Sequence, residues 1–304
     1  MKRLRSGATL VMSAMKGLMA HHGTRSAAAL SFYALFSIAP IIYLAANVAG
    51  MLASDVNFQQ QVTKQFAQLL GPQAATGIDV LLSTLESQSQ SQFQVVIGVV
   101  VLIFSATNMF VQFQLTFNEI FGVQAQARTG FLKQIFDRVV SLGLVLSLGF
   151  LLIVSLVLDS LVLLFNEYLV SLFSDAAVVI AQASQLGALA VLVSSVIYGM
   201  FHFLPDVYLP NYLKLRASLL VAATLLVGKY GMGAYIANSR VSELGGASAS
   251  VFVLMLWIYF SSLILCFAAE VIRVLAENDG VELQPRRYAT VIRAAIGRNE
   301  SSVA

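Results

Sequence analysis

Four polar side chains recur at helical spacing within an otherwise apolar part of the sequence. They stand three, four and seven residues apart in the segment 104–122, which begins inside the run VVIGVVVLIF: Ser105, Asn108, Gln112 and Glu119. On a helix these intervals place side chains along one stripe. Polar groups within an apolar span are costly unless they face protein, a cavity or the interface. The stripe therefore predicts either hydrogen bonds between helices or a polar groove in which Asn108, Gln112 and Glu119 bind a substrate.

Lys229 is a basic residue within another apolar segment. It lies about 12 positions into that segment, roughly 18 Å along a helix at about 1.5 Å per residue. Snorkelling over that distance is difficult, so the ammonium needs a carboxylate, carbonyls or water. Asp159 is the best candidate for a structural ion pair; the alternative is a group that attracts an anion into a cavity. Neighbouring glycines favour the close approach of another helix: Gly228, Gly231 and Gly233.

Three polar residues are expected at similar depth near the ends of different apolar segments: Glu119, His202 and Glu270. Basic residues stand close to the same ends in the sequence: Arg128, Arg216 and Arg273. A single glutamate beside a basic cluster is commonly a salt bridge that fixes two elements together. The other interpretation is a site that holds a zwitterionic or anionic headgroup at the inner leaflet, with arginine contacting phosphate.

Patterns typical of enzymes and metal sites are missing from the sequence. The histidines are His21, His22 and His202, and no HxxxH, DxD or GxSxG pattern accompanies them. A hydrolytic nuclease needs clustered carboxylates or histidines to bind metal and activate water. The single cysteine, Cys266, allows neither an intrachain disulfide nor a CxxC metal pair. No Walker-type phosphate loop occurs. We therefore expect no catalytic residues, no metal and no cofactor.

The composition is that of an integral membrane protein. Of 304 residues, 58% are hydrophobic and 11% charged, whereas soluble proteins carry about 25% charged residues. A span needs about 20 mostly apolar residues, and six segments qualify: 27–52, 93–117, 139–164, 178–204, 217–237 and 247–272. We predict an all-α fold with six transmembrane helices, an N-terminal interfacial helix and short amphipathic periplasmic helices.

The distribution of basic residues predicts the orientation. Of the 18 Lys and Arg, all but Lys64, Lys229 and Arg240 fall on one side if the N-terminus is inside. The positive-inside rule therefore places both termini in the cytoplasm. The same asymmetry explains the net charge of +3. No basic face with interleaved aromatics is visible, so nucleic-acid binding is not expected.

The predicted domains are an interfacial helix over 1–24, the six-helix domain over 25–275 and a charged, partly disordered cytoplasmic tail over 276–304. Residues 56–92 form a periplasmic insertion with two helical patterns, one of whose apolar faces carries Phe58 and Phe66 and the other Leu82. Further residues are assigned structural roles. Pro40 is expected to kink or break the first span, Pro210 and Asn211 to form a tight turn, and Trp257 to pack inside or line a cavity.

Five stretches in order resemble one family. They are LSFYALFSIAP (30–40), FNEIFGV (117–123), LPNYLKLR (209–216), GKYGMGAYI (228–236) and LGGASASVFVLMLWIYFSSLILCFAAE (244–270). The chain is similar over about residues 25–275 to the YihY/BrkB family of bacterial inner-membrane proteins, once labelled ribonuclease BN. Two motifs depart from the family's common form: Glu243 precedes Leu-Gly-Gly where many members have Tyr-Gly, and Ala268 stands where glycine is common. The resemblance implies an inner-membrane location and a role in envelope biology.

The leading functional hypothesis is transport or handling of a lipid or another amphiphilic or anionic substrate in envelope biogenesis. Membrane lipids are then the expected partners, bound in the cavity that the polar stripe, Lys229 and the inner residues would line. The alternative is a membrane scaffold that docks a periplasmic envelope protein through residues 56–92. A membrane-embedded enzyme comes third, and a ribonuclease has no support in the residues.

Overall fold

The computed structural model describes residues 7–52, 63–64, 67, 75–80, 92–125, 176–238, 247–286 and 289–291. Long helices make up most of this part of the chain: α2 (Gly23–Leu52), α5 (Gln92–Ile120), α7 (Ala176–Phe203), α8 (Asn211–Asn238) and α9 (Ala247–Asp279). The short helix α1 (Gly7–Ala20) precedes them. These helices cover five of the six segments predicted to span. The third segment, 139–164, lies outside the described residues, so the number of spans remains a prediction.

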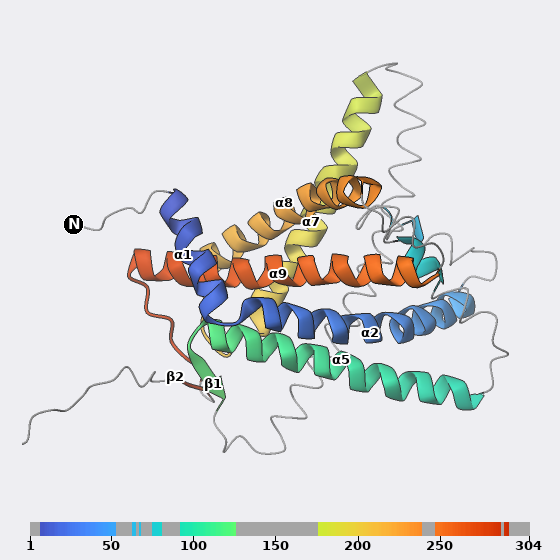
Figure 1. Cartoon of the computed structure of the whole chain (residues 1–304), viewed down its shortest axis with the longest axis horizontal. Coiled ribbons are helices and arrows are strands. Elements are labelled where there is room, and N and C mark those ends of the chain that lie inside the picture. Colours follow the sequence, from blue (N-terminus) through green and yellow to red (C-terminus); the bar gives the residue numbers. More distant parts are fainter. Residues whose placement is uncertain are drawn as a thin grey trace, which may run out of the picture.

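Helices α2, α5 and α9 lie side by side, and α2 runs antiparallel to the other two (Figure 1). Helices α7 and α8 pack on each other, and α8 also packs on α9. Helix α1 lies across the last turns of α9 (Figure 1). The C-terminal ends of α5 and α9 and the N-terminal end of α2 therefore meet at one end of the bundle, which we call the α1 end.

The exposed surface of the helices carries large apolar side chains. Examples on α2 and α5 are 51–68% exposed: Phe32, Phe36, Val100 and Phe104. In the described residues, one helix, Val251–Asp279, meets the length and composition needed to cross a membrane. Helix α2 continues through Pro40, so the helix break that was one expectation for this proline does not occur.

The buried core is concentrated near the α1 end. Phe117 on α5 stacks on Phe201 on α7, with ring centroids 5.2 Å apart, and both side chains are almost fully buried. Leu213 from α8 and Ile272 from α9 belong to the same cluster. Because four helices contribute to this cluster, their ends hold fixed positions relative to one another.

A small sheet lies at the α1 end, which the all-α prediction did not include. Strand β1 (Val123–Ala125) pairs antiparallel with β2 (Ala289–Val291), and Gln124 lies opposite Thr290. Residues 289–291 of the predicted tail are therefore paired with the strand that follows α5. Helix α9 continues to Asp279, and the chain after it folds back onto the bundle. Backbone pairing with β1 orders residues 289–291, and the partial disorder expected of the tail remains a prediction.

Two glycines end the helices that lead into this sheet. Gly122 (φ 67°) follows α5 and Gly280 (φ 66°) follows α9, and glycine adopts such left-handed backbone angles without steric cost. At the end of α9, the amide of Val281 donates to the carbonyl of Ala276 at 2.8 Å, and the amide of Gly280 donates to Glu277 at 3.2 Å. This Schellman arrangement closes α9 and turns the chain toward β2.

Candidate functional site

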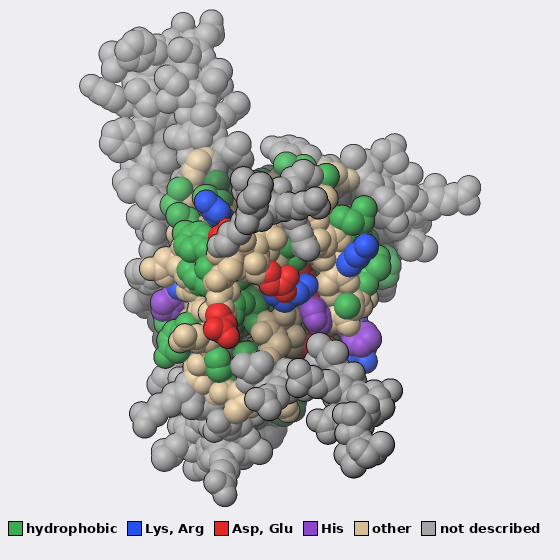
Figure 2. Space-filling model, turned by 90° about the vertical axis from the view of Figure 1, so that its left-hand side faces the viewer, with side chains coloured by type: hydrophobic (Ala, Val, Ile, Leu, Met, Phe, Trp, Pro, Cys, Tyr) green, Lys and Arg blue, Asp and Glu red, His purple; other side chains and the backbone are tan. Residues whose placement is uncertain are grey.

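Charged and histidine side chains gather on the face of the molecule at the α1 end (Figure 2). They fall into three clusters, each named here by one buried member. The Glu270 cluster contains His21, Glu270, Arg273 and Glu277. The Asp206 cluster contains Gln114, Asn118 and Asp206. The Lys214 cluster contains His202, Lys214 and Arg286.

The Glu270 cluster fastens α1 to α9. Glu270 is fully buried and accepts from two sides: His21 Nδ1 lies 2.5 Å from its Oε1, and Arg273 Nε donates to its Oε2 at 2.8 Å. Arg273 also pairs with the exposed Glu277 at 2.5 Å. A buried carboxylate is tolerated only where it is paired and hydrogen-bonded. The contact therefore joins residues far apart in the sequence into one polar centre.

Gly17 allows this contact to form. A Cβ built at this position would overlap the Glu270 carboxylate and would lie 2.7 Å from Arg273 Nη2. Neighbouring residues on the same face of α1, Ala14 and Leu18, are buried. The opposite face of the helix is exposed and apolar: Val11, Met12, Met15 and Met19. Helix α1 thus packs through small residues on α9, and its free apolar face remains available for the membrane surface that the sequence predicts.

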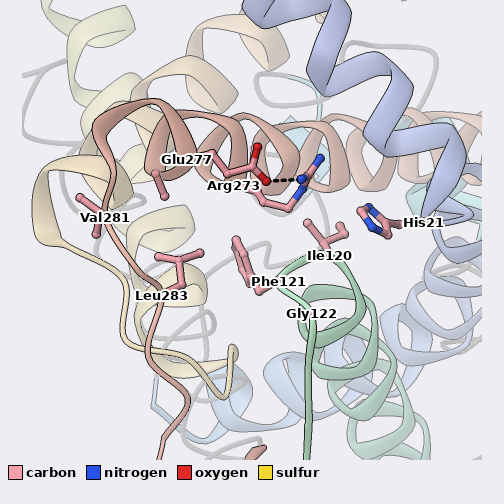
Figure 3. A pocket seen from close by; sticks show the side chains of 9 residues that line it. His21, Ile120, Phe121, Gly122, Arg273, Glu277, Val281 and Leu283 are labelled. Atoms are coloured by element: carbon pink, nitrogen blue, oxygen red, sulfur yellow. Dashed lines mark hydrogen bonds and ion pairs between the residues drawn. The ribbon is translucent and has the colours of Figure 1, made fainter. Parts of the chain in front are cut away.

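A pocket of about 340 Å³ opens beside the Glu270 cluster. Its polar wall is made by His21, Arg273 and Glu277, and its apolar wall includes Phe121 and Leu283. The remaining lining residues are Ile120, Gly122, Ala276 and Val281. In Figure 3 the aromatic ring of Phe121 lies below α9, across the pocket from the Arg273–Glu277 pair. The volume is at the lower end of the range usual for small-molecule sites.

The Asp206 cluster joins α5 to the segment after α7. Asn118 Nδ2 donates to Asp206 Oδ2 at 2.8 Å, and the Asp206 amide donates back to Asn118 Oδ1 at 2.9 Å. Gln114 Nε2 donates to both carboxylate oxygens, at 3.2 and 3.1 Å. Asp206 and Asn118 are 3% and 5% exposed. This reciprocal arrangement satisfies buried polar groups on both sides and fixes the end of α5.

Replacing Asn118 by leucine is expected to destabilise the protein by about 2–3 kcal/mol, because the buried Asp206 carboxylate and amide each lose a hydrogen bond. Gln112→Leu is the matched control on the same helix: its side chain is half-buried, and we expect a loss below about 0.5 kcal/mol. Detergent unfolding followed by the emission of Trp257, the single tryptophan, measures both. Equal losses in the two variants would contradict a special role for Asn118.

The Lys214 cluster joins α7, α8 and the segment after α9. Lys214 Nζ lies 2.9 Å from His202 Nδ1 and 5.2 Å from the centroid of the Tyr198 ring. Arg286 Nη2 donates to the His202 carbonyl at 2.6 Å, at the end of α7, where cationic donors commonly satisfy free carbonyls. Lys214 is only 4% exposed. Burial, and then the positive charge of Arg286, lowers the pKa of Lys214.

The predicted stripe on α5 does not coincide with the polar contacts that α5 makes. Asn108 and Gln112 are half-buried and Glu119 is exposed. The contacts come instead from Gln114 and Asn118, which share another face four residues apart. Their spacing places them on one face of α5, but it does not show that this face makes the polar contacts. Asn118 also stands inside the motif FNEIFGV.

The structure does not bring together the three polar residues that were expected at similar depth, Glu119, His202 and Glu270. Glu270 pairs with His21 and Arg273, while His202 contacts Lys214 and Arg286. No hydrogen bond or ion pair joins either cluster to the exposed Glu119 side chain among the residues that the structure describes. The salt bridge expected between a glutamate and a neighbouring basic residue is found for Glu270 and Arg273, whereas His21 was considered only as a metal ligand or catalytic base.

Lys229 lies in α8, but its side chain and Asp159 are outside the described residues, so their pairing remains a prediction. The close helix approach expected at its neighbouring glycines is not seen where they are described. A Cβ at Gly228 or Gly231 would meet nothing within 4 Å among these residues. The side-chain environment of Gly233 is not described.

The remaining structural residues are placed as follows. The carbonyl of Pro210 accepts from the amides of Leu213 and Lys214, at 3.1 and 3.2 Å, so this turn starts α8 directly at Asn211. Trp257 is 4% exposed and packs inside. In the described residues, no group of three His, Cys, Asp or Glu side chains could hold a metal ion. The docking residues Phe58, Phe66 and Leu82 lie outside the described part of the chain.

Comparison with known proteins identifies relatives over nearly the whole chain. It is 27% identical over 275 residues to a UPF0761 membrane protein of Saccharophagus degradans, which covers 88% of this chain and 59% of the relative. For a UPF0761 membrane protein of Azotobacter vinelandii the identity is 28% over 257 residues, which cover 84% of this chain and 60% of the relative. For a UPF0761 membrane protein of Psychrobacter sp. the identity is 26% over 268 residues, which cover 87% of this chain and 48% of the relative. The chain thus spans about half to three fifths of the length of these relatives.

No solved structure matches the chain. A family model described as Virulence factor BrkB matches residues 14–292, a range that contains the three clusters and the pocket. The match agrees with the ordered motifs noted in the sequence, and the relatives are named as membrane proteins. The chain therefore belongs to the BrkB family of membrane proteins.

Proposed function

We propose that this protein is a multi-pass inner-membrane protein that transports or handles an amphiphilic anionic or zwitterionic substrate, a lipid, in envelope biogenesis. In this proposal both termini are cytoplasmic, as the basic residues predict, and the α1 end faces the cytoplasm. The headgroup enters the pocket beside Arg273, and the acyl chains remain along the apolar exterior of the helices.

The observation that carries the proposal is the two-sided character of the pocket. Arg273 uses Nε on Glu270 and Nη1 on Glu277, so further donors of its planar guanidinium remain for a phosphate. Glu277 offers an acceptor to a headgroup amine. The facing wall, which includes Phe121 and Leu283, suits the glycerol and first methylenes of a lipid. Such a pairing of polar and apolar walls fits an amphiphile better than a free ion.

The apolar exterior supports the same proposal. Large side chains are exposed on helices around the bundle, including Phe104 on α5, Val191 on α7 and Val227 on α8. Extended apolar surface on a folded chain marks contact with lipid or another partner. In this proposal, lipid would contact the exposed apolar side chains of the helices whose ends surround the pocket.

Filling the pocket tests the proposal. In vesicles containing a fluorescent phospholipid, the wild type should increase movement between leaflets, and Leu283→Trp should reduce that movement by about tenfold if the indole occupies the headgroup space. Gln284→Trp is the matched control, because Gln284 is the exposed next residue of the same segment. Lipid movement that is absent in the wild type, or equal in both variants, would contradict the proposal.

A further inference from the structure

The Lys214 cluster brings two cations to the same histidine: Lys214 is buried, Arg286 is half-buried and His202 is exposed. Lys214 is 4% exposed, and burial, followed by the positive charge of Arg286, lowers the pKa of its ammonium. Both cations contact His202: Lys214 Nζ lies at the ring Nδ1, and Arg286 Nη2 donates to the backbone carbonyl. Like charges that lie close together repel each other, and the repulsion is stronger where one of them, here Lys214, is buried.

No carboxylate balances these charges within the described residues. The ion pairs found there join His21 or Arg273 to Glu270, and Arg273 to Glu277. None of them includes Lys214 or Arg286. Glu282, four residues before Arg286, is exposed and belongs to none of these ion pairs. Asp206, the nearest acid along the chain to His202 and Lys214, accepts the Arg286 backbone amide through its own backbone carbonyl, and its carboxylate accepts from Asn118.

Donor groups in the cluster remain unused. Arg286 Nε is buried and has no hydrogen-bond partner in the described structure. Lys214 carries three N–H donors, and its hydrogen bond in the described residues goes to His202 Nδ1. Buried donors normally find a partner, so each orphaned one in a native fold requires an explanation. A bound anion would supply acceptors to both residues.

Aromatic rings border the same cations. Arg286 lies 5.8 Å from the centroid of the Tyr208 ring, and Lys214 lies 5.2 Å from that of Tyr198. Tyr208 is 63% exposed, so the cluster reaches the surface of the molecule. None of the residues of the Lys214 cluster is among the nine that line the pocket beside Glu270.

We propose that Lys214, Arg286 and His202 form a binding site for a phosphate group, either inorganic phosphate or the phosphate of a lipid headgroup. A phosphate oxygen accepts from Lys214 Nζ and another from Arg286 Nε, which satisfies the orphaned donor and offsets the two cations. The site does not rest on the proposed transport of lipid, because none of its three residues lines the pocket.

The test is a phosphate titration of the purified protein in phospholipid-free detergent, followed by line broadening in phosphorus NMR. A second arm measures retention of phosphatidylglycerol by native mass spectrometry. We expect Lys214→Met to weaken binding by at least about tenfold, the usual effect of losing one charge-assisted hydrogen bond. Lys16→Met, which removes an exposed basic side chain on α1, should stay within about twofold of the wild type.

The two arms distinguish the sources of the phosphate. Saturable binding of inorganic phosphate that Lys214→Met removes assigns a free-anion site; retention of phosphatidylglycerol alone, lost in the same variant, assigns a headgroup site. Arg286→Lys keeps the charge but removes Nε, so it should weaken binding even if Lys214→Met does not fold. Wild-type binding in both Lys214→Met and Arg286→Lys, or no binding in either arm by the wild type, overturns the proposal. Leu283→Trp should leave phosphate binding unchanged, which separates this site from the pocket.

Discussion

Replacing Glu270 by glutamine is expected to destabilise the protein by about 3–5 kcal/mol, the usual cost of removing one partner from a buried ion pair. The glutamine keeps the shape but loses the charge that compensates Arg273 and faces His21. Its amide also presents a donor where both oxygens now accept. The fully buried position of Glu270 means that water cannot replace the lost partner without local opening.

Glu277→Gln is the matched control, because Glu277 pairs with the same Arg273 but its side chain is 55% exposed. An exposed pair contributes about 0–1 kcal/mol. Unfolding followed by Trp257 emission compares the two, and labelling of Cys266 reports local opening one helical turn before Glu270. Equal stabilities for Glu270→Gln and Glu277→Gln would show that the buried cluster does not fasten α1 to α9.

The positions of the long helices followed from the sequence because apolar runs of sufficient length determine them. Helix α9 begins where the last predicted span begins, at Ala247, and α5 begins within one residue of its predicted start. The i, i+3 spacing of Glu270 and Arg273 also placed these two side chains on one face. Such local relations require no knowledge of which helices are neighbours.

The polar contacts were harder to predict because α5 is apolar on most of its surface. Spacing shows which residues share a face, but it does not show which face points inward when apolar side chains lie all round the helix. The prediction therefore fell on the stripe through Asn108 and Gln112 and missed the face that carries Gln114 and Asn118. His21 reaches Glu270 across 249 residues of sequence, a pairing that no periodicity reveals. Backbone pairing of β2 with β1 is similarly invisible in composition.

Gly17→Ala is the second change with a large expected effect. Whether it raises or lowers the stability of the protein tests how α1 packs on Glu270. In an exposed helix interior, alanine stabilises relative to glycine by about 1 kcal/mol. At Gly17 the added methyl would overlap the Glu270 carboxylate and crowd Arg273, and neither group can move freely because each is held by the other. We expect a net destabilisation of about 1–3 kcal/mol, the usual cost of overpacking, together with faster thiol labelling of Cys266.

Gly199→Ala on α7 provides the control, because a Cβ at Gly199 would meet nothing within 4 Å. That variant should be neutral or more stable, so the two substitutions are expected to differ in sign. Stabilisation of both by similar amounts would show that α1 does not rest on Glu270. A destabilised Gly17→Ala that also loses phospholipid movement would connect the packing of α1 to the pocket, since His21, four residues after Gly17, forms part of the pocket wall. Loss of stability alone would restrict the role of Gly17 to helix packing.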